Sequence, residues 1–98
     1  MIVRLVTYRA LPDKDVEGWM RGIASELRGV SGMRHVEFVR SLSDPFQWGA
    51  VMHFRTKEDL DNYKATGPYQ SLVQGLREAW LDETKPVNDR VFEVLDIR

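Results

Sequence analysis

The amino-acid sequence predicts an α+β domain with the order β-α-β-β-α-β, the ferredoxin-like arrangement with a four-stranded antiparallel sheet. Its 98 residues are the size of a single domain, so residues 1–98 are expected to fold as one unit. Four segments carry the residue types and alternation of strands, and two regions carry apolar residues at helical spacing. Turn residues separate these segments, and neither a repeat nor a low-complexity linker interrupts them.

The N-terminal third predicts a strand followed by a helix. Residues 1–9 are rich in β-branched residues with apolar groups on both faces, which is typical of a central strand. The helix is expected to begin after Asp13, whose carboxylate can accept hydrogen bonds from unpaired backbone N–H groups, and to end at Gly29. Its apolar face consists of Val16, Trp19, Met20, Ile23, Leu27 and Val30.

The middle of the chain predicts a β-hairpin. Strands are expected at Met33–Leu42 and Phe46–Arg55, joined by Ser43-Asp44-Pro45, in which the proline presets a turn conformation. One face of the second strand is almost purely apolar and is expected to contact the helices; it comprises Phe46, Trp48, Ala50, Met52 and Phe54.

The last third predicts a helical region in two pieces and a closing strand. Thr56 is the expected N-cap of the first piece, and Thr66-Gly67-Pro68 interrupts the region before a second piece that reaches Trp80. Lys85-Pro86 ends it, and Arg90–Ile97 is the expected final strand.

This topology leaves one sheet face without helices, because right-handed crossovers place both helical regions on the same side. A mixed apolar and polar face of that size seldom remains exposed to water, so a homodimer through the sheet faces is expected. The residues assigned to this open face are Arg4, Val6, Tyr8, Val51, His53 and Arg55.

The composition excludes several classes of function. The net charge is −1, so no basic field favours nucleic acid. The chain has no cysteine, which excludes disulfides and thiolate-ligated metals, and two histidines are too few for a His-rich metal site within one chain. No apolar run approaches the roughly 20 residues of a membrane helix. Because the N-terminus also lacks a signal-peptide pattern, a cytoplasmic protein without membrane association is expected.

Short motifs add a family resemblance that covers nearly the whole chain. They are Gly32 before the second strand, Ser43-Asp44-Pro45 at the hairpin, and Phe54-Arg55-Thr56-Lys57-Glu58-Asp59-Leu60 at the start of the second helical region. With the βαββαβ order, they resemble the antibiotic biosynthesis monooxygenase-like dimeric α/β-barrel proteins. The stress-responsive α/β-barrel proteins are similar in outline.

The resemblance implies a homodimer whose two sheets close into a barrel, with a pocket between helices and sheet in each protomer. Family members include cofactor-free quinone-forming oxygenases and haem-degrading enzymes. The haem-degrading pattern is changed here, because its strand-one Asn, its Trp and its haem-ligating His fall on Thr7, Tyr63 and Val73. A Trp that many monooxygenase-like members carry is replaced by Phe54, and the histidines of cyclase-like relatives are absent. No cofactor and no metal are therefore expected.

The candidate catalytic residues are Tyr63 and Tyr69, which flank the break in the second helical region, and His53 on the third strand. A phenol can orient a substrate hydroxyl, and a histidine can carry a proton near neutral pH. Each also has a structural interpretation, as a core aromatic or a hydrogen-bonded sheet residue. The candidate ligand-binding residues are Thr7, Trp19, Trp48 and Trp80, which alternatively fill the core.

Two hypotheses of function remain open at this point. One is a cofactor-free monooxygenase that binds a small apolar phenol or quinone in the pocket, where the substrate anion itself reduces oxygen. The other is a non-catalytic binding or structural dimer whose aromatic residues all lie in the core. A polyketide cyclase-like role is the remaining alternative from the related stress-responsive proteins.

Overall fold

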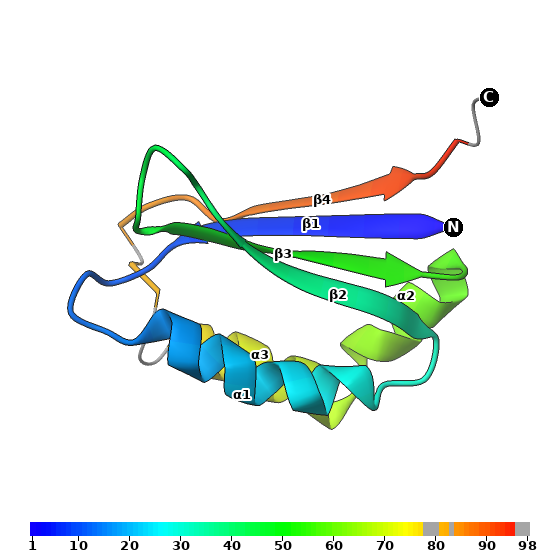
Figure 1. Ribbon diagram of the computed structural model, residues 1–98. Helices are drawn as coiled ribbons and strands as arrows, with labels where there is room; N and C mark the ends of the chain where they lie inside the picture. Colours follow the sequence, from blue (N-terminus) through cyan, green and yellow to red (C-terminus); the bar gives the residue numbers. More distant parts are fainter. Residues whose placement is uncertain (78–80, 83, 96–98) are drawn as a thin grey trace.

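A computed structural model describes residues 1–77, 81–82 and 84–95. Its strands pair in the order β2-β3-β1-β4, all antiparallel, which confirms the predicted ferredoxin-like sheet. The helices lie together on one face of this sheet, as Figure 1 shows. The elements are β1 (Ile2–Arg9), α1 (Val16–Arg28), β2 (Met33–Arg40), β3 (Gln47–Phe54), α2 (Lys57–Lys64), α3 (Gly67–Gly75) and β4 (Asn88–Glu93).

Side-chain caps fix where the helices begin. Thr56 accepts a hydrogen bond from the backbone N–H of Asp59 at 3.1 Å, which confirms it as the N-cap of α2. Thr66 caps α3, which has a proline in its first turn as the sequence predicted. For α1 the predicted cap is wrong by two residues. Asp15, not Asp13, directly precedes the helix and accepts from Gly18 N–H at 3.0 Å.

The end of the chain also differs from its prediction. The final strand begins at Asn88, two residues before the predicted Arg90, and the described ladder ends at Glu93. Ile2–Thr7 of β1 pair with Asn88–Glu93 of β4, and this pairing includes Asn88 and Asp89 in the strand. Residues 96–98 of the predicted strand, like Trp80, lie outside the described residues.

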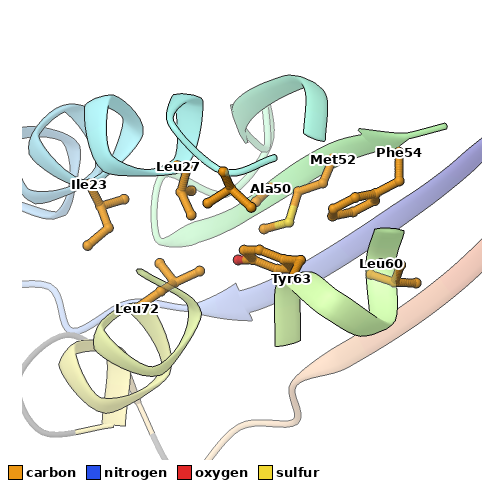
Figure 2. Close-up of a cluster of buried hydrophobic side chains, with 9 residues drawn as sticks. Ile23, Leu27, Ala50, Met52, Phe54, Leu60, Tyr63 and Leu72 are labelled. Atoms are coloured by element: carbon orange, nitrogen blue, oxygen red, sulfur yellow. The ribbon is translucent and has the colours of Figure 1, made fainter. Parts of the chain in front are cut away.

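The core lies between the sheet and the helices. Its largest buried side chains come from both layers. Every second residue of a strand and every third or fourth residue of a helix points into the space between them. Figure 2 shows Tyr63 of α2 between Ala50 and Met52 of β3 and Leu72 of α3. The Tyr63 ring packs against the Phe54 ring with centroids 5.4 Å apart.

The sequence pattern predicted the two faces of β3 correctly and those of β1 wrongly. Trp48 and Met52 face the helices as predicted, and His53 lies on the opposite face. Arg4, Val6 and Tyr8 were predicted on the open face, yet they pair with Met52, Ala50 and Trp48 and face the helices. The open face instead carries Val3, Leu5 and Thr7 of β1 together with Val51 and His53 of β3.

The error in β1 has a physical cause. A charged residue in a strand is normally assigned to the solvent side, because an unpaired buried charge is costly. Here Arg4 is only 5% exposed and has a carboxylate partner on β4, which the sequence pattern does not reveal. The strand alternation then carries Val6 and Tyr8 to the helix side as well.

Replacing Phe54 by alanine is expected to lower the free energy of unfolding by about 3–5 kcal/mol, because it empties a fully buried aromatic site. Urea denaturation followed by circular dichroism measures this change. Phe46→Ala is the matched control, since Phe46 is 36% exposed and its loss is expected to cost much less. Equal losses for the two variants contradict the packing described here.

Candidate functional site

A cavity lies between β1 and α3 on the helix-covered side of the sheet. It has a volume of about 200 Å³, with an inner extension of about 40 Å³. We call it the β1–α3 cavity. Its two parts share six wall residues, namely Arg4, Val6, Tyr8, Tyr69, Val73 and Leu76. The outer part is also lined by Asp89 of β4, by Val87 just before that strand and by Arg77 after α3.

The structure brings α3 over β1 through sequence features of the helix break. Thr66 ends the preceding turn, and Thr66 Oγ1 accepts from the backbone N–H of Tyr69, so α3 starts in a new direction. Gly75 lets α3 approach α1 closely, because an added Cβ would lie only 2.9 Å from Cζ2 of Trp19. On α3, the side chains that line the cavity opposite β1 are Tyr69, Leu72 and Val73.

The polar part of the wall is an ion pair between β1 and β4. Arg4 Nε lies 3.0 Å from Asp89 Oδ1, and Arg4 Nη2 lies 2.7 Å from Asp89 Oδ2. This two-bond geometry matches the planar guanidinium to a carboxylate. The Tyr69 ring centroid is 5.6 Å from the Arg4 guanidinium carbon, within reach of a cation–π interaction.

The ion pair holds both partners charged. Burial by itself lowers the pKa of Arg4, but the hydrogen bond and the charge of Asp89 outweigh it and raise the pKa. The hydrogen bond from Arg4 lowers the pKa of Asp89, with its charge adding to the effect against some desolvation. The cavity wall therefore contains a guanidinium cation and a carboxylate at neutral pH.

Two buried phenols on the helix-covered side, Tyr63 and Tyr8, are held in the neutral form. Burial raises the pKa of Tyr63 to about 12, although the charge of Arg4 opposes the shift. Burial also raises the pKa of Tyr8, whose hydroxyl donates to Met20 Sδ at 3.5 Å. A phenol with such a pKa donates a hydrogen bond at neutral pH and does not serve as a base.

Tyr63 and Tyr69, on either side of the helix break, contact each other, but their surroundings differ. Their rings are 5.2 Å apart in an edge-to-face arrangement. Tyr69 lines the β1–α3 cavity, whereas Tyr63 lies fully buried in the core beside it. Among the described residues, the Tyr63 hydroxyl is the buried side-chain oxygen without a hydrogen-bond partner. A buried hydroxyl in that state has lost its hydration without recovering a bond.

The remaining sequence candidates lie elsewhere. Thr7 lies on the open sheet face, where its methyl is 3.2 Å from the position of a Cβ built on Gly49. Trp19 of α1 packs against α3 and against the buried residues of the core. Trp48 lines a second groove of about 500 Å³ between α1 and β2, whose rim carries exposed charges such as Glu17 and Arg21. None of these three residues lines the β1–α3 cavity.

His53 belongs to a polar cluster on the open face. Its Nε2 lies 4.0 Å from Glu37 Oε1, and Nε2 of His35 lies 3.2 Å from the same oxygen. The two imidazole rings are 5.6 Å apart. In the described part of the chain, no group of three or more His, Cys, Asp or Glu side chains is arranged to hold a metal ion.

Sequence reasoning missed Arg4, Tyr8 and Asp89 as wall residues of the cavity. Arg4 and Tyr8 were assigned to the wrong face, and Asp89 preceded the predicted strand. A signal was available, because an arginine buried within the apolar run Ile2–Val6 of a central strand requires a carboxylate partner. The sequence did not indicate which acid supplies it.

Comparisons with known proteins place the fold. No family model and no curated protein matches the chain. Among solved structures, a Deinococcus radiodurans protein provisionally assigned as an antibiotic biosynthesis monooxygenase aligns with a TM-score of 0.84 and 14% identity, covering 100% of this chain and 96% of the other.

Two further solved structures agree with this match. A Nitrosomonas europaea protein with the same provisional assignment aligns at a TM-score of 0.83 and 18% identity, covering 97% of this chain and 99% of the other. The Rv0793 protein of Mycobacterium tuberculosis aligns at 0.81 and 18% identity, covering 98% and 96%. No helix within residues 1–77, 81–82 and 84–95 is long and apolar enough to cross a membrane.

The Arg4–Asp89 pair predicts a defined acid dependence of stability. Because the folded pKa of Asp89 lies below its ordinary value of 3.8, the folded state binds fewer protons than the unfolded state as the pH falls through that region. The stabilisation is therefore present above pH about 4 and is lost below it. Asp89→Asn is expected to be less stable than the wild type at pH 7, with the difference shrinking towards pH 2. Urea titrations at several pH values measure this, and a difference independent of pH contradicts it.

The structure thus has the ferredoxin-like fold of solved antibiotic biosynthesis monooxygenase-like proteins, with a cavity between its sheet and its third helix.

Proposed function

We propose that the protein binds a small aromatic compound in the β1–α3 cavity and oxidises it without a bound cofactor. The observation that carries this proposal is the cavity itself, which combines apolar walls from Val6, Val73 and Leu76 with a few polar groups. Ligand sites in proteins have this make-up. The fold-level similarity to monooxygenase-like structures supports the reaction class.

The size of the cavity limits the substrate. A volume of about 200 Å³ lies below the roughly 300–1,000 Å³ of sites for drug-sized ligands. A phenol or quinol of one or two rings therefore fits better than a larger polycycle. Tyr69 provides an aromatic wall. It lies at the helix break and lines both this cavity and a shallow groove on the surface of α3.

The proposed reaction needs no electron carrier other than the substrate. A deprotonated phenol or enol gives electrons to dioxygen, and an activated CH₂ group becomes a carbonyl. One oxygen atom forms the carbonyl and the other leaves as water, so the four electrons lost by the carbon are accepted by O₂. The protein contributes desolvation and orientation, since the hydroxyls of Tyr69 and Tyr63 are hydrogen-bond donors beside an apolar site and burial keeps Tyr63 neutral.

The catalytic proposal is tested by oxygen uptake with one- and two-ring phenols, whose ring carbon para to the hydroxyl is the CH₂ group of the keto tautomer. Val73→Phe fills the cavity and is expected to abolish uptake, whereas Ser71→Phe adds the same bulk at an exposed position of α3 and is expected to leave it unchanged. Tyr69→Phe is expected to reduce turnover about tenfold or more by removing a positioned hydroxyl.

Tyr63→Phe separates a chemical role from a structural one. It removes a buried hydroxyl that has no partner among the described residues, so the free energy of unfolding is expected to stay the same or rise. Turnover is expected to fall by about 10²-fold if the hydroxyl serves the transition state. Unchanged uptake in both tyrosine variants contradicts these roles, and the absence of uptake in the wild type favours a non-catalytic binding protein.

The proposal includes a homodimer through the open sheet face. This face has no helix over it, as Figure 1 shows, and it carries Leu5, Val51, Val39 and Phe92. Val39 of β2 and Phe92 of β4, on the two edge strands, are 40% and 49% exposed in one chain, so exposed apolar side chains extend across the whole face. The His53–Glu37–His35 cluster lies on the same face, so any proton transfer by His53 belongs to the seam between protomers.

The oligomeric state tests this part of the proposal. Light scattering after size exclusion is expected to give twice the 11.4 kDa of one chain. Leu5→Glu puts a charge at the centre of the face and is expected to give monomers, whereas Ser25→Glu at an exposed position of α1 is expected to leave dimers intact. A monomeric wild-type protein, or a dimeric Leu5→Glu variant, contradicts an interface on this face.

A further inference from the structure

We propose that Arg4 binds the negative charge of the ligand, which is therefore an aromatic compound with an ionised oxygen, a carboxylate or a phenolate. This inference rests on the proposed ligand site, because it concerns the same cavity. It goes further by assigning a recognition residue and the charge of the ligand. Four observations carry it, and the experiment below separates it from the reaction itself.

The first observation is the position of the guanidinium. Arg4 lies in the middle of a central strand, faces the helices, is 5% exposed and lines both parts of the cavity. Arginine at such a position is costly to bury, and an apolar residue there would pack without that cost. A cation that a ligand can reach from an apolar cavity is a specific recognition device.

The second observation is the set of donors that remain on Arg4. Among the described residues, Arg4 donates side-chain hydrogen bonds through Nε and Nη2, both to Asp89. A guanidinium has five N–H groups, so the Nη1 edge keeps donors for a second oxyanion.

The third observation is the charge of the described wall. The outer part of the cavity is lined by two cations, Arg4 and Arg77, and by one carboxylate, Asp89. The described wall is therefore positive by one charge when Asp89 is ionised, which its lowered pKa ensures at neutral pH. A cavity with this excess attracts an anion and disfavours a cation.

The fourth observation is that aromatic groups lie beside the cation. The Tyr69 ring lies 5.6 Å from the Arg4 guanidinium carbon, and the neighbouring Tyr63 hydroxyl is buried without a partner among the described residues. A flat ligand with an oxyanion at one edge would stack on apolar walls and place its charge at Arg4. The low dielectric of such a site strengthens that interaction.

A purely structural ion pair is the competing explanation, and Asp89→Asn distinguishes the two. Asp89 has a side chain that is 42% exposed, so its neutralisation is compatible with folding. If Arg4 only joins β1 to β4, the variant loses stability and gains no affinity for anions. If Arg4 binds the ligand, the variant frees the guanidinium from its competing carboxylate and binds anions more tightly.

The experiment measures calorimetric binding of 2-naphthoate and of 2-naphthamide, which has the same shape without the charge. The wild type is expected to bind 2-naphthoate at least tenfold more tightly than the amide. Asp89→Asn is expected to strengthen naphthoate binding severalfold and to leave amide binding unchanged. Arg4→Lys keeps the charge but loses the planar fork and is expected to weaken naphthoate binding about tenfold.

Two control variants locate the effect. Arg55→Gln removes an exposed arginine after β3, outside the cavity, and is expected to leave the affinity for naphthoate unchanged. Val73→Phe is expected to abolish binding of both probes, because it fills the cavity. Circular dichroism confirms that each variant is folded before its binding is measured.

The outcomes separate this inference from the proposed function. Equal affinity of the wild type for naphthoate and amide, with no gain in Asp89→Asn, overturns the role of Arg4 and leaves the cavity as a ligand site. Absence of binding by either probe overturns the ligand cavity, and the role of Arg4 with it. Naphthoate binding without oxygen uptake supports Arg4 and contradicts only the oxidation.

Discussion

The pairing register of β1 with β3 is the constraint on which the rest of the structure depends. Arg4 lies opposite Met52 and Tyr8 opposite Trp48, so these β1 side chains join the β3 residues that face the helices. Since side chains alternate along a strand, a slip of one residue would move every β1 side chain to the other face. The cavity, the ion pair and the open face would all be different.

The helix-covered side also combines two requirements that usually conflict. A core needs apolar groups in close contact, and a ligand site needs space and a few polar groups. The chain separates them along α2 and α3. The part around Tyr63, Phe54 and Leu60 is tightly packed, and the part around Val73 and Arg4 is open enough to form a cavity. The helix break at Thr66 marks the boundary between them.

The open side of the sheet differs from the helix-covered side, because no helix lies over it. β1 and β3 present Leu5 and Val51 there, and Glu37 and His35 of β2 form a polar cluster with His53 of β3. An antiparallel sheet tolerates a solvated face when that face is polar. This one is mixed, which is the physical reason for proposing a second copy of the chain as its cover.

The sequence by itself determined the order of the elements, the cap at Thr56, the helix break at Thr66-Gly67-Pro68 and the apolar face of β3, because these depend on neighbours within a few residues. Only the tertiary structure decided the orientation of β1, the partner of Arg4 and the wall of the cavity. Arg4 and Asp89 are 85 positions apart, and no local pattern records such a pairing. A buried charge follows its partner, and the partner is fixed only when β4 pairs with β1.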